Sequence, residues 1–409
     1  MNILFIHGNY PAQFVHLAKA LAAQDHRVVF LTGRKDPEVW PLPGVEVRRF
    51  DLHRQVSPEI HPYLIPIEQA VLQGQAVLRE LDVLAQEGFQ PRLTFVHGGN
   101  GLSLFVRHLF ADTRLIVYME WWFRDDTSRW CFPSYPINQR LSTTMRNSII
   151  LQELEQCDVA VTPTVWQQQQ FPESYHSKIQ VIFDGVDTAF FRPIPVEGEF
   201  VLHGMQGEQP LHISAEAPLL TYATRGMETL RGFPEFMRML PPLLEALPNL
   251  EVVIAGEDRC AYSHPPDRPD GSWKQALLEE LGDRLNLERV HFTGSLMYGE
   301  YRQMLNRSDL HVYFTRSYVT SWGLFQAAAC GASLMVNRDP ATTYVLEENQ
   351  ACWVDLDQPA QLVESALGVL RNVATRRQQL QTSMLRPEWE LGLCLARWQD
   401  LLNVQLAVR

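Results

Sequence analysis

Two arginines, Arg225 and Arg231, stand close together in the segment Thr-Arg-Gly-Met-Glu-Thr-Leu-Arg-Gly, directly after a strand predicted over Leu219–Ala223. A guanidinium group is permanently charged and binds phosphate oxygens through two parallel hydrogen bonds. A diphosphate leaving group needs such charge neutralisation as its bond to a sugar breaks. The alternative is a pair of surface arginines that form ion pairs with Glu228 and its neighbours. These residues alone do not decide between the two.

A second candidate is the strand–loop–helix unit around Ser317–Gly331, with a strand predicted over Asp309–Phe314 and a helix over Phe325–Cys330. Thr320 and Ser321 are residue types that favour the N-cap of a helix. Backbone N–H groups at a helix start lack partners and lie at the positive end of the helix dipole. They can therefore receive a phosphate or a sugar hydroxyl. An ordinary strand-to-helix turn fits the same pattern equally well.

Glycine-rich loops follow two predicted strands in the first half of the chain, at residues 7–9 and 97–101. Glycine lets the backbone approach a ligand closely, although the same residue also serves tight turns. Neither loop has the glycine pattern and downstream acid of dinucleotide-binding dehydrogenases, which disfavours a nicotinamide enzyme. The candidate ligand contacts on these loops are Gly8, Asn9, His97, Gly98 and Gly99.

A carboxylate and two indoles, Glu120-Trp121-Trp122, follow another predicted strand, Leu115–Met119. The rings can stack on the C–H faces of a sugar while the carboxylate binds its hydroxyls. A packed aromatic pair beside a salt-bridged Glu120 explains the same residues at least as well. Glu120 and Trp121 are kept as candidates for binding an acceptor.

Strands and helices alternate along the chain, apart from a break between Phe191 and Pro210 where proline and polar residues gather. The strands are apolar throughout, which is typical of a sheet covered on both faces. We therefore expect an α/β protein with two Rossmann-like, doubly wound domains that face each other across a cleft. The expected domains are residues 1–195 and 196–385, and a C-terminal helix within residues 386–409 packs back on the first. Pro241 and Pro242 are expected to break or kink a helix over Pro234–Ala246.

The composition, with 46% hydrophobic residues and a net charge of −12, is that of a globular protein. The acidic balance argues against broad nucleic-acid binding and against tight adhesion to anionic lipid, although a peripheral membrane contact stays open. No apolar run is long enough to span a bilayer, and the first residues do not resemble a signal peptide, so we expect a cytoplasmic protein. The scattered cysteines predict reduced core thiols. We expect no metal, because Asp355 and Asp357 fit a solvated turn.

Several of these segments, in this order, resemble glycosyltransferase family 4. Members of that family carry two glutamates that flank a loop and its helix, the second in the run Glu-Ala-Met-Ala-Cys-Gly. The matching run here is Gln-Ala-Ala-Ala-Cys-Gly, so Gln326 takes the second position and Tyr318 the first. Tyr318 opens Tyr-Val-Thr-Ser-Trp, which is similar to the aromatic-Val-x-Ser-Trp motif of a bacterial subgroup. Arg225 and Arg231 stand where the family has a phosphate-binding arginine and lysine.

The resemblance implies the GT-B fold and a retaining, metal-independent glycosyltransferase (hexosyltransferase type). It would move a sugar from a nucleotide-diphosphate sugar to a glycan, lipid or protein, with no cofactor beyond that donor. The implied catalytic residues are Arg225, Arg231, Gln326 and Glu120. The implied donor-binding residues are Arg225, Arg231, Gly294, Leu296, Thr320, Ser321, Trp322, Gly323 and Gln326. The implied acceptor-side residues are Gly8, Asn9, His97, Gly98, Gly99, Glu120 and Trp121.

Two further functions stay open. The first is an inactive or weakened relative that binds a nucleotide sugar or a protein partner, because Gln326 lacks the charge of the family's glutamate. The second is a nucleotide-sugar epimerase on the same architecture, for which no convincing pair of acid/base carboxylates is visible. Assays for donor hydrolysis and for inversion at the sugar C2 separate these from a transferase.

Overall fold

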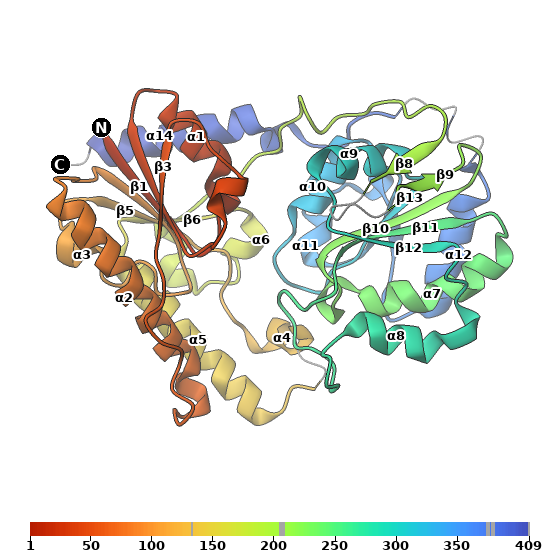
Figure 1. Cartoon of the computed structure of the whole chain (residues 1–409), viewed down its shortest axis with the longest axis horizontal. Helices are drawn as coiled ribbons and strands as arrows, with labels where there is room; N and C mark the ends of the chain where they lie inside the picture. The colour runs from red at the N-terminus through yellow and green to blue at the C-terminus, as the bar shows by residue number, and fades with distance from the viewer. Residues whose placement is uncertain (132–133, 204–208, 374–376, 378–380, 408–409) are drawn as a thin grey trace. The chain divides into compact units, whose positions relative to one another are not determined.

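The computed structural model describes residues 1–131, 134–203, 209–373, 377 and 381–407. The chain divides into two compact units, each built on a parallel sheet (Figure 1). The first unit comprises Met1–Ser128, Tyr135–Gly185 and Glu388–Arg409, and the second comprises Arg129–Ser134 and Val186–Pro387. The division thus follows Gly185, whereas the proline-rich break in the sequence placed it at residue 195.

The first unit holds a seven-stranded parallel sheet in the order β3-β2-β1-β4-β5-β6-β7. Its middle strands are apolar at nearly every position and almost completely buried, as expected for strands covered on both faces. The strands are β1 (Asn2–His7), β2 (Arg27–Thr32), β3 (Val45–Arg49), β4 (Leu93–His97), β5 (Arg114–Tyr118), β6 (Val159–Thr162) and β7 (Ile179–Val181).

Helices cover both faces of this sheet (Figure 1). On one face pack α2 (Ile65–Gln86), α3 (Val106–Leu109) and α5 (Ile137–Gln156). On the other face, α1 (Val15–Ala22) packs beside the C-terminal helix α14 (Leu391–Ala407), whose Trp398 and Leu402 join the core around Phe5. Two short helices, α4 (Asp125–Ser128) and α6 (Val165–Gln168), complete the unit.

The second unit holds a six-stranded parallel sheet in the order β12-β11-β10-β13-β14-β15. The strands are β10 (Leu219–Gly226), β11 (Glu251–Glu257), β12 (Val290–Gly294), β13 (Leu310–Tyr313), β14 (Leu334–Asn337) and β15 (Cys352–Val354). An antiparallel pair, β8 (Phe200–Leu202) and β9 (Leu211–Ile213), lies where the sequence indicated only a polar break. Residues 204–208 of that break lie outside the described residues. The expected α/β class with two doubly wound units is therefore confirmed.

One face of the second sheet is covered by α7 (Phe233–Ala246), α8 (Trp273–Leu281) and α12 (Pro359–Leu370). The pair β8–β9 and α9 (Tyr298–Arg307) pack on the other face (Figure 1). Pro241 and Pro242 lie inside α7, which is one continuous helix, so the predicted break is wrong. The flanking Leu240, Leu243 and Leu244 are buried in the core, and this packing outweighs the local cost of the prolines.

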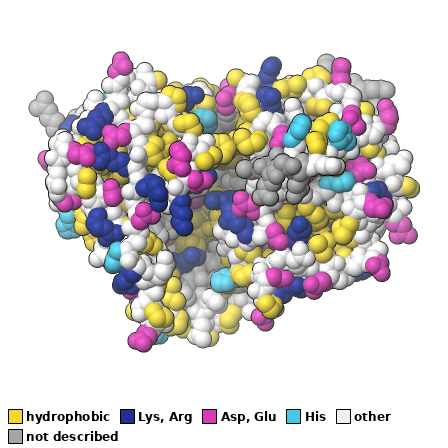
Figure 2. Space-filling view, in the orientation of Figure 1, with side chains coloured by type: hydrophobic (Ala, Val, Ile, Leu, Met, Phe, Trp, Pro, Cys, Tyr) yellow, Lys and Arg dark blue, Asp and Glu magenta, His cyan; other side chains and the backbone are white. Residues whose placement is uncertain are grey.

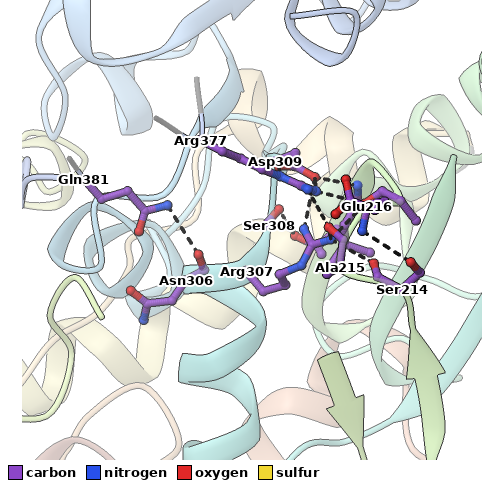
Figure 3. Close-up of polar contacts among 12 residues, drawn as sticks. Ser214, Ala215, Glu216, Asn306, Arg307, Ser308, Asp309, Arg377 and Gln381 are labelled. Atoms are coloured by element: carbon purple, nitrogen blue, oxygen red, sulfur yellow. Dashed lines mark hydrogen bonds and ion pairs between the residues drawn. The ribbon is translucent and has the colours of Figure 1, made fainter. Parts of the chain in front are cut away.

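A buried ion network lies at the amino-terminal ends of two strands of the second sheet, β10 and β13 (Figure 3). The carboxylate of Asp309, just before β13, pairs with Arg307 at 3.1 Å and with Arg377 at 2.6 Å, and it accepts the backbone N–H of Leu219 at 2.8 Å. Both guanidinium groups also donate to backbone carbonyls of residues 214–217. Burial lowers the pKa of Arg307 below its ordinary value. The network ties the start of β10 to the start of β13.

A buried histidine on β13 makes the stability of this unit depend on pH. His311 is 1% exposed and lies 2.7 Å from the hydroxyl of Thr221, and burial lowers its pKa to about 3. In the unfolded chain His311 takes up a proton near pH 6.5, whereas in the folded chain His311 does so only near pH 3. The unfolded state thus binds more protons in this window, so stability is lost as the pH falls from 6.5 towards 3.

When the pH falls from 7 to 5, His311 should lower the free energy of unfolding by about 2 kcal/mol. We expect His311→Leu to remove that share of the pH dependence, while Thr221 keeps its bond to Ser308 at 2.7 Å. Urea titrations of both proteins at the two pH values measure it. Equal losses in wild type and variant would contradict the assignment.

Acidic and basic side chains are interspersed on the face of the molecule shown in Figure 2, and no broad basic field appears on it. Among the described residues, no helix combines the length and apolar character that a membrane crossing requires.

Candidate functional site

Each parallel sheet has one point where its strand order reverses, and ligands of such folds bind outside the strand ends there. In the second sheet this point lies between β10 and β13. The loop after β10 carries Arg231, Arg225 is the last residue but one of β10, and the loop after β13 carries Thr315–Ser321. The arginines and the motif around Ser321, far apart in the sequence, therefore lie on neighbouring strand ends.

Arg231 links these two loops. Its side chain is almost fully buried, and its Nη1 donates to Oγ1 of Thr315 at 2.8 Å and to the carbonyl of Val319 at 3.0 Å. The ring of Tyr262 lies 5.3 Å from the guanidinium carbon. Burial opposes the charge, but the surrounding tyrosines and one carboxylate raise the pKa of Arg231 above its ordinary value. Arg231 is thus a cation held in place within the loops.

Arg225 is exposed, and its Nη1 lies 3.5 Å from the hydroxyl of Tyr262. The sequence allowed both arginines to be paired with Glu228. Instead, the Glu228 carboxylate accepts backbone N–H groups of residues 261–263, and within the described residues it forms no ion pair with either arginine. The positive charge on this loop is therefore available to an anion.

The loop after β13 is fastened to the loop after β14. Asn337 exchanges two hydrogen bonds with the backbone of Thr315, at 2.9 and 2.8 Å. The hydroxyl of Ser317 donates to Asp339 at 2.7 Å, and burial raises the pKa of that carboxyl group. Thr320 is buried and its hydroxyl donates to the carbonyl of Ala341 at 2.7 Å. Thr320 therefore holds the loop in place, and its hydroxyl is already engaged.

The helix after this loop, α10 (Trp322–Ala329), starts earlier than the predicted Phe325. Ser321 is its N-cap residue, but neither predicted capping hydroxyl caps the helix. Oγ of Ser321 lies 3.2 Å from the hydroxyl of Tyr313. The first turn, with Trp322 and Gly323, is half-buried. The first N–H groups of the helix lack acceptors within it and can donate to a ligand.

Gln326 lies one turn into α10 and is half-buried, and its side-chain amide forms no hydrogen bond with the part of the chain that the structure describes. Gly294 and Leu296 stand at the end of β12, two strands from the reversal point. Gly294 is exposed, while Leu296 packs partly into the core beside β8 and β9. These two residues are therefore further from Arg231 in the sheet order than the loop after β13.

In the first sheet the order reverses between β1 and β4, where the two glycine-rich loops follow. A chain of hydrogen bonds runs there from His7 to Glu120. The backbone N–H of Asn9 donates to Nδ1 of His7 at 2.8 Å, so Nε2 carries the proton and donates to Oε1 of Gln13 at 2.9 Å. Nε2 of Gln13 donates to Glu120 at 2.5 Å, and Nε2 of His97 lies 3.3 Å from the other carboxylate oxygen. The Glu120 carboxylate is thus oriented from two sides.

The second glycine-rich loop is shaped largely by packing. A Cβ on Gly98 would lie 2.7 Å from Sδ of Met119, so a larger residue does not fit there. Gly99 has a positive φ of 89°, and its N–H donates to the buried carboxylate of Glu153, whose pKa burial raises. Gly8, by contrast, has open space around its Cα.

The indoles after β5 do not form an open platform. Trp121 is 5% exposed and its ring lies 6.1 Å from that of Trp166. Trp122 is partly buried against Phe171. Trp121 therefore belongs to the core, as the alternative of a packed aromatic pair predicted, and it does not offer a ring face to a sugar. Glu120 stays at the end of the strand.

No three His, Cys, Asp or Glu side chains in the described ranges converge to hold a metal ion. Asp355 accepts the backbone N–H of Asp357 at 2.9 Å, and Asp357 pairs with Arg316 at 3.1 Å, so this pair forms a local turn.

Three residues of these clusters were not among the candidate site residues from the sequence, namely Gln13, Glu228 and Tyr262. Tyr262 lies in a proline-rich loop that looked like plain surface, and Gln13 lies just before a helix. Glu228 was visible as a carboxylate between two arginines, but its partners follow it by more than 30 residues. The polar character of Gln13 and Glu228 beside candidate loops was the one available signal.

These two units have the architecture of the GT-B fold. Three solved structures share the fold over almost their whole length. The first is a sucrose-phosphate synthase from Thermosynechococcus elongatus, with a TM-score of 0.73 and 14% sequence identity over 100% of both chains. The second is the catalytic domain of starch synthase IV from Arabidopsis thaliana bound to ADP and acarbose, with a TM-score of 0.67 and 12% identity over 99% of both chains. The third is HepE from Anabaena in complex with UDP-glucose, with a TM-score of 0.61 and 12% identity over 99% of this chain and 100% of HepE.

Two family models match the sequence. Residues 24–191 match the glycosyl transferase family 4 group, and residues 237–400 match a glycosyl transferase-like family. The chain therefore belongs to the glycosyltransferase family 4 group. No curated protein matches the chain in sequence.

Proposed function

We propose that this protein transfers a sugar from a nucleotide-diphosphate sugar to an acceptor, with retention of configuration and without a metal ion. The observation that carries the proposal is the placement of Arg225 and Arg231 at the reversal point of the second sheet. Permanent positive charge at this point suits a diphosphate leaving group, whose developing charge must be stabilised. Solved proteins of the same fold hold ADP and UDP-glucose, which supports a nucleotide donor.

In this proposal the loops of the second unit bind the donor. Arg225 and Arg231 contact the diphosphate, and the first N–H groups of α10 at Trp322 and Gly323 donate to phosphate or sugar oxygens. The free amide of Gln326 hydrogen-bonds the nucleotide ribose or the sugar. Gly294 and Leu296 border the base.

The first unit supplies the acceptor side. Glu120 is the group best placed for it, because a hydrogen bond from Gln13 and proximity to His97 orient its carboxylate. A carboxylate at a strand end can accept the hydrogen bond of an acceptor hydroxyl and take up its proton. The proposed acceptor is a hydroxyl group of a glycan, a lipid or a protein.

The donor site is tested by titration calorimetry with UDP, GDP and ADP. We expect one of them to bind, and Arg225→Ala to weaken it by about 10- to 100-fold, the range for a charged hydrogen bond. Arg238→Ala is the matched control, because Arg238 is an exposed arginine of the same unit that pairs with Glu280 on the outside. Equal affinity in wild type and Arg225→Ala would remove Arg225 from the donor site.

A second candidate function is a binding protein that holds the nucleotide sugar without turnover. It is favoured by Gln326 and Tyr318, which stand where the family carries two glutamates. Incubation with the sugar form of the nucleotide that binds separates the two. Consumption of the donor, with or without acceptor, supports the transferase, whereas binding without consumption supports the binding protein.

A further inference from the structure

A fully buried carboxylate, Glu228, joins the loop after β10 to the loop after β11. Its Oε2 accepts the backbone N–H groups of Ala261, Tyr262 and Ser263 at 3.1, 2.9 and 2.7 Å, and the hydroxyl of Ser263 at 2.9 Å. Successive N–H groups that converge on one anionic oxygen form a backbone nest, and charged acceptors make the stronger hydrogen bonds. The carboxylate thus determines where residues 261–263 lie.

The same loop touches the end of β10 directly. A Cβ on Gly226 would lie 2.6 Å from the carbonyl oxygen of Arg259 and 3.1 Å from the backbone nitrogen of Ala261. Only glycine allows this approach, since a side chain would collide with rigid backbone. Residues 259–263 are therefore held both by a close backbone contact and by the Glu228 carboxylate.

This arrangement places the side chain of Tyr262 among the residues proposed to bind the diphosphate. Tyr262 is 36% exposed, and its ring faces the guanidinium of Arg231 at 5.3 Å and the ring of Tyr318 at 5.5 Å. Its hydroxyl lies 3.5 Å from Nη1 of Arg225. A tyrosine ring over a guanidinium is itself favourable, so the two groups support each other's position.

We propose that Tyr262 is a further ligand-binding residue of this site and that Glu228 is the residue that positions it. The ligand class is a diphosphate, because a phosphate oxygen held by Arg225 lies within reach of a hydroxyl that can donate to it. Glu228 positions Tyr262 through the loop, since its bonded oxygen is fully used by residues 261–263. The inference rests on the proposed function, because it assumes that the two arginines bind the donor's diphosphate.

The test measures binding of UDP, GDP, ADP and inorganic pyrophosphate by calorimetry. We expect Tyr262→Phe to lower the affinity for pyrophosphate and for the nucleotide that binds by about threefold to tenfold, which is the effect of losing one hydrogen bond. The corresponding nucleoside, which has no phosphate, should bind the wild type and Tyr262→Phe with equal affinity. Tyr175→Phe, in the first unit, is the matched control and should change nothing.

The role of Glu228 is tested by combining two substitutions. Glu228→Gln keeps an oxygen acceptor but loses the charge, so we expect a loosened loop and an affinity loss similar to that of Tyr262→Phe. Because Glu228 acts through Tyr262, the double variant should be no weaker than Tyr262→Phe alone. A purely structural defect would instead add to the loss and would weaken the nucleoside as well.

The outcomes separate this inference from the proposed function. Weakening by Arg225→Ala together with unchanged affinity of Tyr262→Phe overturns the inference and leaves the donor site standing. Fully additive losses in the double variant overturn the role of Glu228. If the wild type binds none of the four probes, both the donor site and the inference fail.

Discussion

Arg231→Ala is expected to lower kcat/KM for the donor by about 100- to 1,000-fold, the range for removing one preorganised donor to developing charge. The guanidinium is buried, fixed by Thr315 and Val319, and cannot be replaced by a water molecule without loss of charge. The loss should appear mainly in kcat, because the leaving diphosphate gains charge as the sugar bond breaks. Steady-state kinetics with the donor identified by calorimetry measure it.

The controls separate charge from geometry. Arg231→Lys keeps the charge but not the guanidinium geometry by which Nη1 donates to Thr315 and Val319, so we expect an intermediate loss. Arg238→Ala should retain wild-type kinetics. Because Arg231 also links two loops, the melting temperature of each variant must be measured. A folded Arg231→Ala protein with undiminished turnover would show that this arginine does not contact the donor.

Much of the fold could be predicted from the sequence because strand, helix and turn signals are local. The apolar strands and their alternation with helices predicted both parallel sheets. Arg231 and the motif around Ser321 were predicted on loops after strands, and the strand order shows that these loops are neighbours. Arg225 was predicted on the same loop as Arg231, but β10 is longer than expected and includes it. The segment β8–β9 was missed because its two strands are short and flank polar residues.

The details of the candidate site depend on contacts that a single sequence does not display. Glu228 and Tyr262 come together because a loop 33 to 35 residues downstream folds onto the end of β10. Trp121 looked like a sugar platform, but its burial depends on how α6 and β5 pack. The hydroxyl of Thr320 looked free for a cap or a ligand, yet the loop after β14 takes it up. In each case a partner distant in the sequence decided the role.

Asp309→Ala is expected to destabilise the second unit by about 3–5 kcal/mol, the range for removing one partner of a buried ion pair. The side chains of Asp309 and Arg307 are each 5% exposed. Without the carboxylate, Arg307 keeps its bonds to backbone carbonyls but carries an uncompensated buried charge. The backbone N–H of Leu219 also loses its carboxylate acceptor, although the backbone pairing of β10 with β13 remains. Urea denaturation followed by fluorescence measures the loss.

The matched control is Glu280→Ala, which removes the carboxylate of an ion pair on the outside of the same unit. Arg238 and Glu280 are 49% and 42% exposed, and solvent screens such pairs, so the expected cost is below about 1 kcal/mol. The deleted group is a carboxylate in both substitutions, so their difference reports burial together with the lost acceptor of the Leu219 N–H. A similar small loss for Asp309→Ala would mean that water reaches Arg307 as soon as its partner is removed. In that case the network would orient the starts of the strands without contributing much to stability. Nucleotide affinity should be unchanged, because the network lies at the amino-terminal ends of the strands, whereas Arg231 follows the carboxyl end of β10.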